Sequence, residues 1–191
     1  MNNILKYRIM ATWPQMKLLK EHMFSVSQAS NILLALKYEE NEKNKSLKKN
    51  IYLSNEDLDK KVLLKIKQQK LVYDSKLLKQ ERVRFLYNYF STLEKYKHSI
   101  ENLAFVKYAK NGYQSFQFGC EQYKLKDGKA KNGSNIKILS ILGQNFELDC
   151  KNDIPFGFRI PSIIFDGISF FIVLKYLKES DLINYGKSEP I

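Results

Sequence analysis

Hydrophobic residues in the first part of the chain recur at three- and four-residue steps, a spacing typical of helices. Pro14 suits the first turn of a helix, and apolar residues follow it at roughly helical spacing: Met16, Leu18, Leu19 and Met23. A second apolar series follows Ser25-Val-Ser-Gln28, which has the spacing of a capping box: Ala29, Ile32, Leu33 and Leu36. The pattern predicts two helices separated by a break at Phe24-Ser25, and then a polar loop over residues 39–50.

Two more helices are predicted in the same half. Ser54-Asn-Glu-Asp57 has the outline of a capping box, and an apolar series follows it at four-residue steps: Leu58, Val62 and Ile66. Asp74 or Ser75 can cap a longer helix that continues toward Asn111-Gly112. Its apolar seam is the strongest periodic signal in the chain: Leu86, Tyr89, Leu93, Tyr96, Ile100 and Leu103. We expect this long helix to be the central spine, and the alternative is a coiled coil that would make a homodimer.

The hydrophobic period changes to two in the second half, which indicates strands. An alternating run over residues 113–118 is interrupted at Gly119 and continues over 120–125, and β-rich runs occupy residues 136–142, 146–150, 156–165 and 168–174. Asp166-Gly167 lies between the last two runs and suits a two-residue hairpin turn. These runs predict four to five antiparallel strands after a helical half. The predicted fold is α+β, with a basic helical region at 1–111 and an antiparallel β region at 112–191, packed together as one domain.

Charge is distributed unevenly along the 191 residues. The chain carries 32 Lys and Arg against 20 Asp and Glu, a formal net charge of +12, and residues 1–100 account for 20 of the basic and 10 of the acidic side chains. An excess of this size favours an anionic partner. A coding bias toward A/T-rich codons would produce the same lysine excess, and arginine occurs at four positions: Arg8, Arg82, Arg84 and Arg159.

The basic residues of the second half of the helical region are the candidate nucleic-acid ligands. The predicted phosphate contacts are Lys60, Lys61, Lys65, Lys67, Arg82, Arg84 and Lys95. On the long helix, one face away from the apolar seam combines hydrogen-bond donors at helical spacing: Arg84, Asn88, Ser91, Lys95 and His98. An ordinary solvated helix face has the same composition, so this alternative stays open.

The break at Phe24-Ser25 gives a second way to bind DNA. Two short helices joined by a turn have the outline of a helix-turn-helix element, in which the start of the second helix faces the bases. Ser25, Ser27, Gln28 and Asn31 would then be exposed for base contacts. Capped helical hairpins are also common in proteins that do not bind DNA.

Signatures of catalysis are mostly absent from the sequence. It contains no GxGxxG, GxxxxGK[ST], HExxH or GxSxG segment, and its histidines are His22 and His98. An acid-x-Lys triplet on a predicted strand, Asp149 with Lys151, fits a metal-dependent nuclease in which Asp127 or Asp166 supplies a further carboxylate. Asp59, Asp74 and Asp127 begin similar triplets, about as many as this lysine content produces by chance.

The sequence therefore predicts a non-catalytic protein that binds DNA or RNA, mainly through phosphate contacts, as a subunit or accessory factor of a nucleoprotein complex. One alternative is a protein-binding module or inhibitor that docks an acidic or nucleic-acid-binding surface. The other is the metal-dependent nuclease. No cofactor, structural metal or membrane partner is expected. The first residues lack the apolar stretch of a signal peptide, so a cytoplasmic location is expected.

Overall fold

A computed structural model describes residues 4–95, 114–119, 122–130, 133–150, 154 and 158–176, apart from the side chains of 158–160 and 176. Within these ranges the fold is α+β, as predicted, and the sheet has seven strands rather than four to five. The helices are α1 (Trp13–Leu47), α2 (Asn55–Gln68) and α3 (Ser75–Lys95). The strands are β1 (Ile4–Met10), β2 (Gln114–Gln117), β3 (Tyr123–Lys129), β4 (Asn135–Ile141), β5 (Gln144–Asp149), β6 (Phe158–Phe165) and β7 (Phe170–Tyr176).

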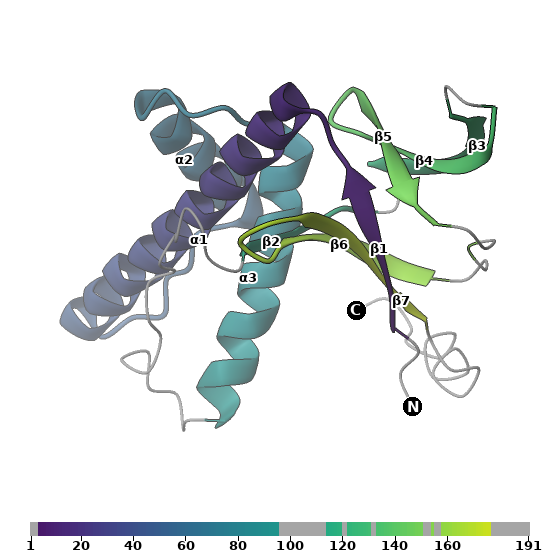
Figure 1. Ribbon diagram of the computed structural model, residues 1–191. Coiled ribbons are helices and arrows are strands. Elements are labelled where there is room, and N and C mark those ends of the chain that lie inside the picture. The colour runs from purple at the N-terminus through teal and green to yellow at the C-terminus, as the bar shows by residue number, and fades with distance from the viewer. Residues whose placement is uncertain are drawn as a thin grey trace. The chain divides into compact units, whose positions relative to one another are not determined.

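The sheet includes a strand from the N-terminus of the chain. Its order is β2-β6-β7-β1-β5-β4-β3, with every neighbouring pair antiparallel. The purple strand β1 accordingly lies between β5 and β7 in Figure 1. Residues 4–10 were predicted to be part of the helical region, and that prediction is wrong. The segment alternates between exposed side chains such as Lys6 and Arg8 and more buried ones such as Ile9, as a half-buried strand does.

The chain divides into two compact units. Residues Met1–Met16 and Asn111–Ile191 form one unit, which contains the sheet, and Lys17–Lys110 form the other, which contains most of the helices. The division falls within the first turn of α1, so the N-terminal strand belongs with the C-terminal part of the chain.

Helix α1 is continuous over 35 residues, which corrects two predictions. The helix passes through Phe24-Ser25 without a turn, and the Ser25 hydroxyl donates to the Glu21 carbonyl oxygen (3.0 Å) and the Ser27 hydroxyl to that of Phe24 (2.7 Å). Such bonds satisfy a serine inside a helix. Ser25 and Ser27 are also buried, so the exposed recognition helix is not present. The polar run after Tyr38 stays helical to Leu47, since it is rich in strong helix formers.

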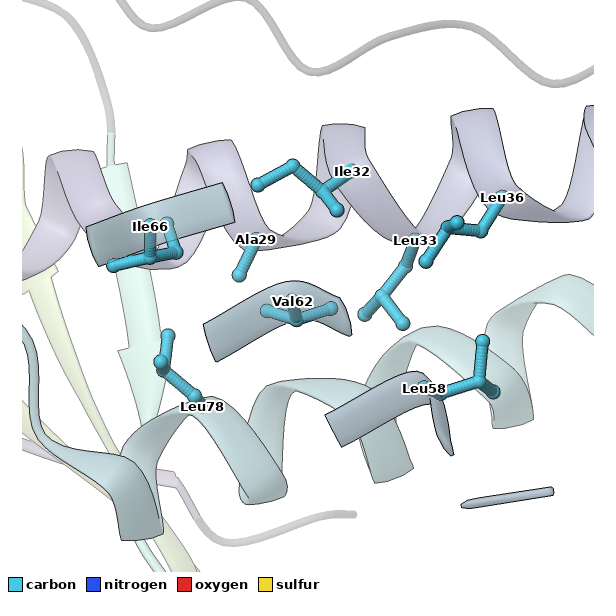
Figure 2. Close-up of a cluster of buried hydrophobic side chains, with 8 residues drawn as sticks. All are labelled: Ala29, Ile32, Leu33, Leu36, Leu58, Val62, Ile66 and Leu78. Carbon is cyan, nitrogen blue, oxygen red and sulfur yellow. The ribbon is translucent and has the colours of Figure 1, made fainter. Parts of the chain in front are cut away.

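The helical unit has a hydrophobic core made by all three helices. The predicted series Leu58, Val62 and Ile66 is fully buried on α2, which confirms that pattern. Figure 2 shows these side chains directed toward residues of α1 and α3. The cluster consists of Ala29, Ile32, Leu33 and Leu36 from α1, the three α2 residues, and Leu78 from α3. This packing fixes the polar faces of α2 and α3 on which the candidate ligands lie.

The two-residue hairpin turn lies in a different hairpin from the one predicted. The hairpin at Asp166-Gly167 is confirmed, but β6 and β7 pair at Phe165 and Phe170, so four residues form the loop. The two-residue turn lies instead at Leu142-Gly143, between the paired residues Ile141 and Gln144. Both turn residues have positive φ, 52° for Leu142 and 70° for Gly143, as a type I′ turn requires.

Leu142→Asn is expected to raise the free energy of unfolding by about 0.5–1 kcal/mol, because asparagine tolerates the left-handed region better than leucine does. Urea denaturation followed by circular dichroism measures the change. Leu142→Val is the control and is expected to destabilise the protein, since a β-branched residue fits this backbone poorly. An asparagine variant no more stable than the wild type would contradict the assignment of the turn.

Candidate nucleic-acid interface

The predicted lysines of α2 lie around the sides of the helix that the core leaves exposed, and they do not form one cluster. Lys60 lines a hollow of about 270 Å³ together with Asp59 of α2 and Lys79 of α3. Lys61 lines a different hollow of about 140 Å³, together with Lys43 of α1. Lys60 and Lys61 thus belong to different surfaces, although they are adjacent in the sequence.

Two of these α2 lysines interact with other side chains of the protein. The Lys60 ammonium lies 2.7 Å from the Glu56 carboxylate, and both side chains are exposed. An exposed pair of this kind contributes at most about 1 kcal/mol, so it holds Lys60 only weakly. The Lys67 ammonium lies 5.8 Å from the ring centroid of Tyr73, within the range of a cation–π contact.

Both predicted arginines form ion pairs within the helical unit. Arg82 of α3 donates from Nε to the Asp59 carboxylate of α2 at 2.7 Å. Arg84 makes two hydrogen bonds to the Glu81 carboxylate, at 2.8 and 2.7 Å, and the Ser30 hydroxyl of α1 donates to the same carboxylate. The Arg82 guanidinium therefore joins α3 to α2, whereas the Arg84 guanidinium neutralises a carboxylate of its own helix that also accepts from Ser30 of α1. Neither pairing is evident from the sequence.

The last candidate, Lys95, is exposed at the described end of α3. Asn88 and Ser91, on the donor face predicted for this helix, are exposed as well. His98 and the seam residues beyond Lys95 lie outside the described residues. Within them, Tyr89 of the seam is buried, and Leu86 and Leu93 are half-buried.

A group of lysines, which we name the lysine flank, combines α1 and α2: Lys43, Lys61 and Lys65. Lys43 and Lys61 line the same hollow, and Lys65 follows Lys61 by one helical turn on the same side of α2. None of the three makes an ion pair with any residue in the described part of the chain. Glu39 and Glu40 also line the hollow, but Glu40 is paired with Lys37, so the three lysines exceed the one remaining carboxylate and the flank keeps a net positive charge.

A larger hollow of about 670 Å³ opens beside the lysine flank, and we name it the asparagine pocket. Its wall includes four asparagines and three aromatic residues: Asn41, Asn44, Asn50, Asn55, Tyr52, Tyr89 and Phe90. The Asn44 side chain fixes the loop after α1, accepting from the Ile51 backbone N–H at 2.8 Å and donating to the Ile51 carbonyl oxygen at 3.0 Å. No pattern in the sequence indicates this pocket, because its residues come from α1, the following loop, α2 and α3.

A buried ion pair lies in the wall of the asparagine pocket. The Lys37 ammonium is 2.7 Å from the Glu40 carboxylate, and the side chains are 6% and 8% exposed. Glu40 also accepts a hydrogen bond from the Leu53 backbone N–H. Burial, reinforced by the negative charge of Glu40, raises the pKa of Tyr89, so its phenol stays neutral. The charges of Lys37 and Glu40 are therefore satisfied within the protein.

The described residues do not assemble the carboxylate site of the nuclease hypothesis. The sheet register places Asp149 opposite Arg8, whereas Asp127 pairs with Lys137 opposite Leu148, on the other face of the sheet. Within the described ranges, no group of three His, Cys, Asp or Glu side chains could hold a metal ion. Lys151 lies outside these ranges.

The other residues considered for catalysis make hydrogen bonds within the protein or are buried. The Asp166 carboxylate accepts hydrogen bonds from the backbone N–H groups of Ser169 and Ile168, and these bonds lower its pKa. Burial lowers the pKa of His22, which favours its neutral form. Its imidazole is only 5% exposed, so a substrate in solution could not reach it.

The sheet contributes a second basic surface that the sequence analysis assigned to neither half. The register and alternation of β1, β3 and β7 place five exposed cations on one face: Lys6, Arg8, Lys124, Lys126 and Lys175. The Lys6 ammonium lies 3.8 Å from the ring centroid of Phe171 on that face. Glu147 and Asp149 share it, so its charge is mixed. The alternation of residues 4–10 was the signal that could have revealed this surface.

Comparison with known proteins adds no family to this picture. The sequence matches neither a protein-family model nor a curated protein. In the described part of the chain, no helix has both the length and the apolar character needed to cross a membrane.

Proposed function

We propose that this protein binds nucleic acid without catalysing a reaction on it, and that phosphate contacts supply most of the affinity. The observation that carries the proposal is the lysine flank, where lysines from two helices lie near one another without ion-pair partners among the described residues. Phosphate groups relieve the repulsion between such cations and release condensed counterions when they bind. The net charge of +12 adds a long-range attraction to any polyanion.

The residue types favour backbone contacts over base recognition at this flank. Lysine presents a point charge, whereas arginine provides the planar fork that reads guanine or grips phosphate with two hydrogen bonds. Arg82 and Arg84 already use their guanidinium groups on carboxylates. We therefore expect the flank to bind DNA or RNA with little dependence on sequence, as a subunit or accessory factor of a nucleoprotein complex.

The test compares two triple variants that remove the same amount of charge. Lys43→Ala, Lys61→Ala and Lys65→Ala together remove the flank, and Lys6→Ala, Lys124→Ala and Lys126→Ala remove exposed lysines of the sheet. Affinity for labelled oligonucleotides is measured by fluorescence anisotropy across a salt titration. The flank variant is expected to bind at least tenfold more weakly, with a log–log salt slope reduced by about three, because each lysine neutralises about one phosphate.

The control variant separates a local site from net charge alone. It should keep most of the affinity, although its net charge equals that of the flank variant. Equal losses in both variants would show that the attraction is distributed over the whole surface. Absence of binding by the wild type at about 50 mM salt, where phosphate contacts are strong, would contradict the proposed function itself.

A protein-binding module is the second candidate, and a specific observation favours it. Val83, Tyr87 and Phe90 are exposed on α3 at helical spacing, with Tyr87 74% exposed. Exposed apolar residues in a row on one helix face are typical of a surface that packs against a partner. A complex with another protein that persists after nuclease treatment would favour this candidate, and dimerisation through α3 would appear as a doubled mass in solution.

A further inference from the structure

The asparagine pocket has the size and the aromatic content of a ligand site. Its volume of about 670 Å³ lies within the range of small-molecule pockets, about 300–1,000 Å³. Tyr52 is 68% exposed and Phe90 is 54% exposed, and both line this hollow. Large aromatic surfaces left in water beside a pocket are suited to stacking on a planar ring.

The polar groups of the pocket fit a neutral ligand with both donors and acceptors. Asn41, Asn50 and Asn55 line it from three different segments, and their amides make no hydrogen bond within the described residues. Each amide offers a donor and an acceptor. Lys37 and Glu40 satisfy each other, so the wall does not require an ionic ligand. The edges of nucleobases carry the matching pattern of donors and acceptors.

The position of the pocket connects it to the lysine flank. Three residues of its wall, Glu40, Asn44 and Leu53, also line the hollow that contains Lys43 and Lys61. The two hollows are therefore neighbours on opposite sides of a shared wall. A nucleotide with its base in the pocket could direct its phosphates toward the lysines, away from the carboxylate of Glu94, which also lines the pocket.

We infer that the asparagine pocket accepts one unpaired base of a single-stranded nucleic acid, stacked on Tyr52 or Phe90 and held at its edge by the asparagines. The inference rests on the proposed function, because the lysine flank supplies the phosphate contacts that bring the strand to the pocket. Single strands are then preferred over duplexes, since a base in a duplex must first be unpaired and unstacked.

The experiment uses three labelled probes: a 12-nucleotide single strand, its duplex, and the same strand with every base removed. The third probe keeps all the phosphates, so it reports the flank alone. The wild type is expected to bind the intact strand about tenfold more tightly than the abasic strand, a gain typical of stacking one base on an aromatic residue. Binding is measured by fluorescence anisotropy at one fixed salt concentration.

Two sets of variants test whether the tighter binding of the intact strand over the abasic strand depends on the pocket. The double variant Tyr52→Ala with Phe90→Ala should bind the intact strand about tenfold more weakly than the wild type and the abasic strand with unchanged affinity. Tyr87→Ala is the matched control, because it removes an exposed aromatic residue of α3 outside the pocket, and it should bind like the wild type. Asn50→Ala with Asn55→Ala changes exposed side chains only and should weaken binding of the intact strand without altering the salt slope.

The outcomes distinguish this inference from the proposed function. Equal affinity of the wild type for the intact and abasic strands, together with a loss in the lysine flank variant, would overturn the pocket and leave the function in place. Unchanged binding in both pocket variants would also overturn it. Failure of the wild type to bind any probe would overturn both.

Discussion

Arg84→Met is expected to lower the free energy of unfolding by about 3–5 kcal/mol, the range typical of breaking a buried ion pair from one side. The reason lies in its partner, since the Glu81 side chain is only 2% exposed whereas that of Arg84 is 29% exposed. Without the guanidinium, the Glu81 carboxylate would keep the Ser30 hydroxyl and lose both hydrogen bonds that neutralise it. Urea denaturation followed by circular dichroism measures the loss.

Substitution of the partner, Glu81, should cost less unfolding free energy than substitution of Arg84. This difference between the two variants is the sharper test. Glu81→Gln leaves a half-buried arginine that can turn toward water, so its penalty is expected to be smaller than that of Arg84→Met. The double variant Arg84→Met with Glu81→Gln should recover most of the stability, because no charge is then left buried alone. A double variant as unstable as Arg84→Met, or a loss below about 1 kcal/mol in Arg84→Met, would contradict this role of the pair.

The stability loss expected for arginine variants affects how the candidate phosphate-binding residues should be tested. Arg82 and Arg84 were predicted to contact phosphate, yet Arg82 joins α3 to α2 through Asp59, and Arg84 neutralises the buried Glu81 carboxylate of its own helix. A weaker affinity in an arginine variant would therefore mix a loss of folded protein with a loss of contact. The lysines of the flank are the cleaner probes, since they make no ion pairs with described residues and removing them leaves the helix pairs intact.

Local patterns in the sequence were enough for the parts of the fold whose signals are contained in one segment. The spacing of Leu58, Val62 and Ile66 identified the buried face of α2, because a four-residue step keeps side chains on one side of a helix. The strand runs of the second half followed from a period of two, and the hairpin at Asp166-Gly167 from its turn residues, and both signals also lie within one segment. The α+β class followed from these elements.

Features decided by distant partners were not predictable in this way. A serine can cap a helix or bond within one, so Ser25-Val-Ser-Gln28 was ambiguous, and only the burial of α1 decides between the two. Strand β1 has its pairing partners more than 130 residues away. The Arg82–Asp59 pair spans 23 residues, and the asparagine pocket draws on four segments.

Lys37→Met is expected to cost about 3–5 kcal/mol of unfolding free energy as well, because it leaves the buried Glu40 carboxylate with the Leu53 N–H as its one remaining partner among the described residues. Lys37→Met with Glu40→Gln should regain most of this loss, because the glutamine oxygen can still accept from Leu53 and no charge is left unpaired. Glu40→Met in the same background is the control, and it should regain less, since the Leu53 amide then lacks its acceptor. Thermal and urea denaturation of the three variants measure these differences.

This double variant also decides whether the buried pair serves the fold or the ligand. If Lys37 and Glu40 only support the loop that carries Tyr52, the folded Lys37→Met, Glu40→Gln protein should bind the intact single strand as tightly as the wild type. If the carboxylate itself contacts the base, the variant should lose affinity for the intact strand and keep its affinity for the abasic strand. Because the pair is already satisfied within the protein, we expect the first result, with the asparagines and aromatic residues providing the recognition.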